Sequence, residues 1–203
     1  MSDLRTQSLL RASTLATRPE LRQELVHELR QIESSNSVTA SELYEAFLQL
    51  YLFAGFPAAL EAVRALSKIF DLHHKAGDSK ITQSAPYTKY FESGTELYQR
   101  VYADKAIRVR EEMIRLSPEL AEWALLEGYG KTLSREGLDG QTRELCIVAI
   151  LTQLSWERQL FSHLLGARNL GATAQQISEA ILIGANGDEA KLSSAEQLRA
   201  KLV

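Results

Sequence analysis

The stretch from Leu145 to Leu154 is apolar on nearly every side of a helix. Such a helix is enclosed by other protein, so the stretch predicts a central core helix. After a break near Ser155, apolar residues recur at the spacing of one helix face. These residues are Trp156, Leu160, Leu164 and Ala167. The pattern predicts two consecutive helices that pack as an antiparallel hairpin.

Two titratable side chains fall within this predicted hairpin. His163 follows Leu160 by three residues and precedes Ala167 by four, which places its imidazole on the buried face of the second helix. Glu144 lies in the first turn of the core helix, where an antiparallel partner would bring the two side chains close together. The pattern therefore predicts a buried acid facing a buried base. Structural roles also fit both residues: a hydrogen-bonded core histidine, and a carboxylate favoured by the positive end of a helix.

Helical patterns extend over the rest of the chain, on both sides of one polar segment. Residues 1–20 fit a short amphipathic helix or an ordered arm, and the leucine spacing predicts a helix from Pro19 to Ile32. Residues 76–90 begin with a run that lacks helical periodicity and contains Gly, Asp, Ser and Pro, so we expect them to connect two halves. The first half covers residues 1–75 and the second covers residues 91–203.

Three capping boxes mark expected helix starts, because a hydroxyl and a Glu or Gln three residues later satisfy unpaired backbone N–H groups. Thr39 and Thr173 each begin such a box, and the segments that follow them can be laid on one another as a weak internal repeat. The third box, Ser193 with Glu196, predicts a final helix through Leu202. The expected fold class is all-α, with two related halves.

Composition narrows the possible functions. The net charge of −3 leaves no basic excess for binding nucleic acid. The N-terminus has no apolar signal core and no apolar run is long enough to cross a bilayer, so no membrane association is expected. The single cysteine, Cys146, cannot form an internal disulfide, which makes the cytoplasm the simplest compartment. No metal site is expected, because the adjacent His73 and His74 point in different directions on a helix.

The segments YGKTLSREGLDGQTRELCIVAILTQL and HLLGARNLGATAQQISEAI resemble the carboxymuconolactone decarboxylase family, whose sister branch is the alkylhydroperoxidase D-like proteins. The shared features are a Gly-Leu-Asp entry to a core helix, an Arg-Glu pair, a Gly-Ala-x-Asn-x-Gly-Ala-Thr turn and a His one helix later. The resemblance covers roughly residues 94 to 184. It implies the alkylhydroperoxidase D-like helical fold and assembly into trimers or hexamers.

The chain departs from the family pattern in three ways. Peroxidase relatives carry a Cys-x-x-Cys pair before the His, but Trp156 and Gln159 stand at those places here. The missing dithiol argues against a thiol peroxidase. Family decarboxylases commonly have a Glu one turn before the His, where this chain has Gln159. The family's Gly-x-Pro helix pair, with Gly55 to end one helix and Pro57 to begin the next, stands ahead of the His-bearing half. That order resembles a permuted or duplicated arrangement.

The resemblance implies a cofactor-free carboxy-lyase that acts on a small carboxylated lactone or related acid. Loss of carbon dioxide leaves an electron-rich carbon that must be protonated. His163 could donate that proton while Glu144 fixes its tautomer, Arg135 or Arg143 could hold the substrate carboxylate, and Tyr129 could line the pocket. Each arginine has an alternative role in an ion pair with Glu136, Asp139 or Glu144.

A second function of a different class is a non-catalytic helical oligomer that kept the fold and serves as a scaffold or binding module. One helix and the turn after it carry more large apolar residues than one face can bury, which predicts a surface for self-association. These residues are Tyr44, Phe47, Leu48, Tyr51, Leu52 and Phe56. A concave pocket at His163 would favour the enzyme, and a filled one would favour the scaffold.

Overall fold

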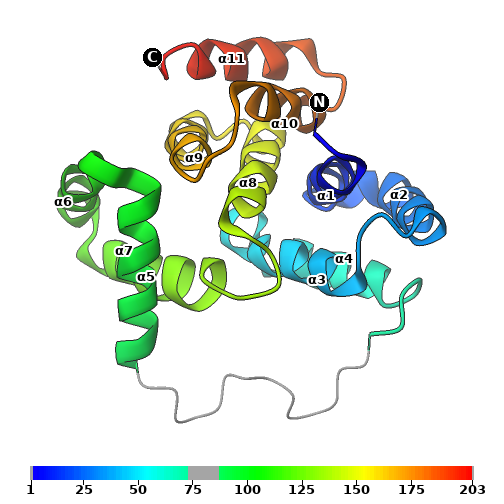
Figure 1. The fold of residues 1–203 in the computed structure, drawn as a ribbon, viewed down its shortest axis with the longest axis horizontal. Helices are drawn as coiled ribbons and strands as arrows, with labels where there is room; N and C mark the ends of the chain where they lie inside the picture. Colours follow the sequence, from blue (N-terminus) through cyan, green and yellow to red (C-terminus); the bar gives the residue numbers. More distant parts are fainter. Residues whose placement is uncertain (1, 73–86, 203) are drawn as a thin grey trace.

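Helix α8 (Gly140–Leu154) runs through the centre of the molecule, and its residues from Thr142 to Gln153 are buried without interruption. Figure 1 shows the remaining helices arranged around it, with α1 and α9 on opposite sides and α10 across one end. The computed structural model describes residues 2–72 and 87–202, and the regular secondary structure of these residues is entirely helical. The all-α prediction is confirmed.

The first part of the chain forms α1 (Leu4–Leu15), α2 (Arg22–Ser35), α3 (Ala40–Gln49) and α4 (Tyr51–Leu66). The second part forms α5 (Tyr87–Tyr102), α6 (Ala106–Leu116), α7 (Pro118–Trp123), α8, α9 (Glu157–Asn169), α10 (Ala174–Ala185) and α11 (Glu189–Arg199). Short 3-10 turns lie at Pro19–Leu21 and Ala103–Lys105, and a π-helical segment covers Ala124–Leu133.

The predicted hairpin is formed by α8 and α9, and it is antiparallel. Leu170, just after α9, lies beside Gly140 at the start of α8. Farther along, Gly166 packs against Glu144. Ser155 ends α8 in a left-handed conformation with φ of 58°, which is where the sequence places the break. The sharp turn reverses the chain and lets α9 pack back along α8.

Side-chain caps set the starts of several helices. Asp139 accepts a hydrogen bond from the backbone N–H of Thr142 at 2.9 Å and so caps α8. The boxes at Thr39 and Thr173 are both present. The third predicted start is wrong, because α11 begins at Glu189 behind the cap of Asp188, which places Ser193 and Glu196 inside the helix. The same helix ends at Arg199 and not at Leu202.

Helix α4 bends where the sequence predicts a helix end. Gly55 has φ of 85° and ψ of 164°, a non-helical conformation that a glycine adopts without steric cost. Pro57 then lies in the first turn of the second part of α4, where its missing N–H is not needed. Leu50, between α3 and α4, keeps right-handed helical angles. The chain therefore continues from α3 through the first turn of α4 before it bends.

Both halves of the chain contribute to one hydrophobic core. Residues 1–20, which the sequence analysis left as a helix or an ordered arm, contain α1. This helix packs against α8 and α10 and so belongs to the centre of the fold. Leu9, Leu10 and Ala12 of α1 are completely buried together with Ile147 of α8. The connection expected at residues 76–90 overlaps α5, which begins at Tyr87. Residues 76–86 of that connection lie outside the described part of the chain, and so do His73 and His74.

Among the described helices, none has both the length and the apolar character needed to cross a bilayer.

Candidate active site

The predicted acid and base meet in the α8–α9 hairpin. Nδ1 of His163 lies 2.8 Å from Oε2 of Glu144, and the two residues are 7% and 3% exposed. An ionised carboxylate can only accept hydrogen bonds, so the imidazole donates through Nδ1 and keeps Nε2 for another partner. The pair is therefore arranged as a ring whose tautomer is fixed on one side and whose other nitrogen can exchange a proton.

Gly166 makes this close approach possible. It follows His163 by one helical turn, and a Cβ at this position would lie 2.7 Å from Oε2 of Glu144 and 2.9 Å from Cγ1 of Val101. Any larger residue would displace the carboxylate from the imidazole. The Phe53 ring packs edge-on against the His163 ring, with ring centroids 5.4 Å apart.

A cluster of tyrosines lies next to this pair. The Tyr129 hydroxyl donates to the Tyr102 hydroxyl at 3.0 Å, and both rings contact Tyr98. Burial raises the pKa of Tyr129 well above its ordinary value, and the nearby Tyr102 and Glu144 raise it further. Burial likewise raises the pKa of Tyr102. The structure thus places Tyr129 in a buried group of neutral phenols beside Glu144, within the π-helical segment.

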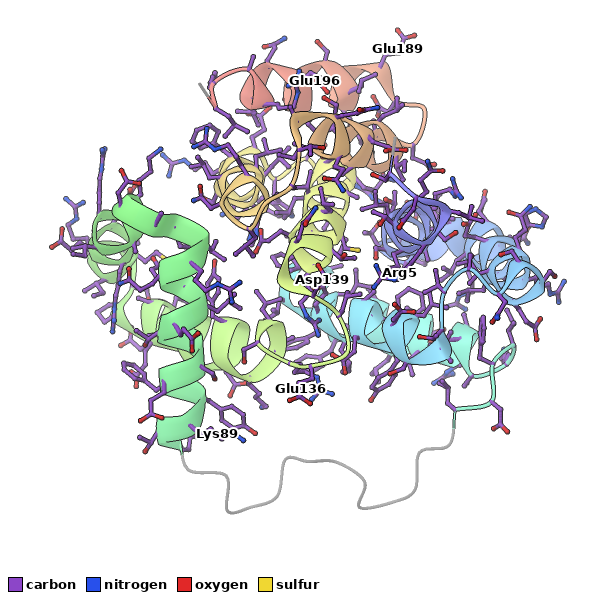
Figure 2. The ribbon with its side chains drawn as sticks, in the orientation of Figure 1. Arg5, Lys89, Glu136, Asp139, Glu189 and Glu196 are labelled. Carbon is purple, nitrogen blue, oxygen red and sulfur yellow. The ribbon has the colours of Figure 1, made fainter. Side chains whose placement is uncertain are left out.

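Arg135 and Arg143 belong to a different cluster, around Glu45 of α3. Arg143 is 2% exposed and donates to Oε2 of Glu45 at 2.8 Å, to the carbonyl oxygen of Leu138 at 3.1 Å and to that of Arg135 at 3.0 Å. Arg135 donates to both Glu45 carboxylate oxygens, at 2.8 and 3.0 Å. The structure supports ion pairing for both arginines, with Glu45 as their partner in place of the neighbouring carboxylates. Glu136 is exposed in the loop before α8 (Figure 2).

The Glu45 cluster is also electrostatically tight. Burial alone would raise the pKa of the Glu45 carboxyl, but the hydrogen bonds and charges of Arg135 and Arg143 outweigh burial and hold this pKa below its usual value. Glu45 therefore carries its negative charge under ordinary conditions. No local pattern in the sequence indicates this partner, because 98 residues separate Glu45 from Arg143.

The positions of the family's redox pair are not set up for thiol chemistry. Trp156 is 56% exposed and Gln159 is exposed at the start of α9. Cys146 is fully buried in α8, and burial raises the pKa of its thiol to about 11. Within the described residues, no group of three or more His, Cys, Asp or Glu side chains is placed to hold a metal ion.

Two hollows in the described part of the chain lie away from the acid–base pair. One, of about 260 Å³, is lined by Arg168, Ile177 and Arg199. The other, of about 420 Å³, lies between α2 and α4 beside Arg30 and Lys68. Neither is lined by His163 or Glu144, and both of these side chains are buried.

The part of the chain that contains the acid–base pair is similar to a known protein family. Residues 118–194 match the model of the carboxymuconolactone decarboxylase family. This segment belongs to that family. It contains both members of the acid–base pair, together with Tyr129, Arg135 and Arg143. The chain is also 31% identical over 145 residues to "Peroxisomal protein 2" of Schizosaccharomyces pombe, in a match that covers 68% of this chain and 65% of that relative. The chain thus spans just under two thirds of the relative's length.

Proposed function

We propose that this carboxymuconolactone decarboxylase-like protein is a cofactor-free carboxy-lyase that acts on a small carboxylated lactone or a related acid. The observation that carries the proposal is the buried contact of 2.8 Å between His163 and Glu144. A buried carboxylate that orients an imidazole and leaves one ring nitrogen unused is an arrangement suited to general acid–base catalysis.

In the proposed reaction, the bond between the substrate carbon and its carboxylate breaks and carbon dioxide leaves. The bonding electrons remain on the carbon, where conjugation to the lactone carbonyl stabilises them. His163 enters the step protonated on both nitrogens, with Nδ1–H held by Glu144, and transfers the Nε2 proton to that carbon. Solvent then restores the proton. The closely packed surroundings of the pair favour this step, because exclusion of water strengthens interactions with developing charge.

The arginines have a narrower role in this proposal than the resemblance implies. Arg143 is completely enclosed and bonded to Glu45, so it supports the site from behind. Arg135 is partly exposed, and it could hold a substrate carboxylate only by sharing or releasing Glu45. The substrate acid therefore needs a further partner.

The test is a screen of carboxylated lactones and small keto acids for release of carbon dioxide, followed by His163→Gln. Removing a general acid lowers the rate by about 10²–10⁴-fold, and the variant should keep the circular dichroism spectrum and melting temperature of the wild type. Glu144→Gln should lower the rate by less, because the imidazole remains. Full activity of His163→Gln on a substrate that the wild type turns over would rule out the proposed proton donor.

A non-catalytic oligomeric scaffold is the second candidate, and two observations favour it. Neither of the two hollows described above is lined by His163 or Glu144, and several large apolar side chains are exposed. In the segment predicted to associate, Phe47 is buried, Tyr44, Leu48, Tyr51 and Leu52 are half-buried, and Phe56 is 67% exposed. Helices α6 and α7 instead expose Ile107, Ile114, Leu116, Leu120 and Trp123. We propose self-association, as trimers or hexamers, through this surface of α6 and α7. A stable monomer in sedimentation at micromolar concentration would contradict it.

The compartment is likewise a proposal. A single buried cysteine suits the cytoplasm or another compartment that keeps thiols reduced. The name of the Schizosaccharomyces pombe relative, "Peroxisomal protein 2", assigns that protein to the peroxisome. Fractionation of cells that express the full-length protein would distinguish the two compartments.

A further inference from the structure

Gln49, the last residue of α3, is a fully buried side chain whose polar atoms are unpaired. Its exposure is 0%, and neither its amide oxygen nor its amide nitrogen has a hydrogen-bond partner among the described residues. Buried polar groups are almost always paired, because an unpaired donor or acceptor destabilises the folded state. Gln153 shows the usual situation: it is 5% exposed and accepts a hydrogen bond from Nζ of Lys191 at 3.2 Å.

Two contacts fix the place of Gln49 in the molecule. Four residues earlier, Glu45 bonds to Arg143 in the first turn of α8. Four residues later, Phe53 packs against His163. Residues four apart share one helix face, and the helical angles of Leu50 continue that face from α3 into α4. Gln49 therefore lies between these two contacts, on the face of α3 and α4 that meets the α8–α9 hairpin.

We propose that Gln49 is a substrate-binding residue of this site, whose amide nitrogen donates to a carboxylate or lactone carbonyl oxygen of the ligand. The inference rests on the proposed function and adds the group that holds the substrate oxygen. An amide suits this task beside His163, because it binds an oxygen atom without titrating and so does not compete for the transferred proton. Unpaired polar groups that persist in a well-packed protein are expected where function requires them.

With Gln49 in this role, a substrate acid can be held while both arginines stay bonded to Glu45. Phe53 packs against the His163 ring, so in this proposal it moves aside for the ligand, and the non-helical Gly55 two residues later allows this turn of α4 to move.

The experiment compares Gln49→Leu with wild type in the full chain, with Gln153→Leu as the matched control. Leucine fills a similar volume and removes the unpaired amide, so Gln49→Leu should melt at a higher temperature than wild type. It should also bind paraconic acid, a carboxylated γ-lactone, about 10- to 100-fold more weakly in titration calorimetry, the range for one hydrogen bond to a charged group. Gln153→Leu should melt lower, because Lys191 loses its acceptor, and should bind paraconic acid as wild type does.

Each outcome decides one of the two proposals or both. A Gln49→Leu variant that melts lower than wild type overturns the inference, because the amide then has a structural partner. Unchanged binding by Gln49→Leu overturns the inference and leaves the proposed function standing. Binding that requires Gln49, combined with turnover that does not require His163, overturns only the proton donor. A wild type that binds neither paraconic acid nor the other carboxylated lactones and keto acids of the screen overturns both.

Discussion

Arg143 and Glu144 are consecutive residues of α8, yet they belong to two buried ionic clusters of different character. Arg143 is surrounded by acceptors: a carboxylate and two backbone carbonyl groups within 3.1 Å. Glu144 contacts Nδ1 of His163, and no described residue forms a hydrogen bond with the other ring nitrogen, Nε2. A buried charge whose hydrogen-bonding groups are paired within the protein stabilises the fold. A buried pair that keeps one ring nitrogen for another partner is suited to acid–base chemistry.

The largest expected effect on stability comes from breaking the filled cluster. Arg143→Leu leaves Glu45 buried with only Arg135 as its partner. We expect a loss of about 3 kcal/mol in the free energy of unfolding, the lower end of the range for breaking a buried pair. Urea denaturation measures it. Arg22→Leu, which removes a half-exposed ion pair with Glu61, is the control and should cost less than about 1 kcal/mol. Equal losses in the two variants would show that the cluster has no special structural role.

The next effect tests the spacing of the acid–base pair. In Gly166→Ala the added methyl group meets Oε2 of Glu144 at 2.7 Å, so the carboxylate has to move away from His163. Such overpacking costs about 1–3 kcal/mol, and the NMR signals of the His163 ring should change. Gly128→Ala is the matched control, because a Cβ there meets nothing within 4 Å. That variant should be stabilised by about 0.5–1 kcal/mol, because Gly128 lies inside the π-helical segment. A Gly166→Ala variant as stable as this control would contradict the close packing described here.

The sequence predicted those parts of the molecule that depend on local chemistry. Apolar periodicity and capping residues located the α8–α9 hairpin, the break at Ser155 and the caps at Thr39 and Thr173. These signals act within one or two helical turns, so neighbouring residues are enough to read them. The Glu144–His163 contact was also predicted, because a hairpin with a short turn fixes which residues of its two helices meet.

The sequence did not predict interactions that depend on the arrangement of distant segments. Glu45 and Gln49 lie in the first part of the chain, and nothing in their spacing shows which part of α8 they face. The π-helical segment at Ala124–Leu133 also reads as an ordinary helix in sequence. Helix α1 was uncertain because it buries small polar residues as well as leucines; Thr14, for example, bonds its hydroxyl to the carbonyl oxygen of Leu10 at 2.9 Å.

The dependence of stability on pH tests the Glu45 cluster, and its expected effect is smaller than that of the substitutions. The pKa of Glu45 is lowered in the folded state, so the unfolded chain takes up a proton first as the pH falls. Its contribution to stability is therefore complete above the usual Glu value of 4.5 and is lost as the pH falls below it, through the folded pKa. Urea denaturation from neutral pH down to acid should show a steeper loss for wild type than for Glu45→Gln. Parallel curves would contradict the lowered pKa.

The smallest expected effect concerns peroxide chemistry, where we predict no activity in wild type and no change in Cys146→Ser. A peroxide-reducing cycle needs a thiolate and a second, resolving thiol. Cys146 is the only cysteine, is fully buried, and has its pKa raised to about 11 by burial, so almost none of it is thiolate at neutral pH. A thiol-dependent peroxide assay with both proteins measures this directly.

The positive control replaces Trp156 and Gln159 by cysteine, which places two thiols at the exposed N-terminus of α9, where the helix favours a thiolate. That variant should react quickly with a disulfide reagent while wild type does not. Peroxide turnover by wild type that disappears in Cys146→Ser would overturn the prediction, since it would require the buried thiol to become accessible and ionised.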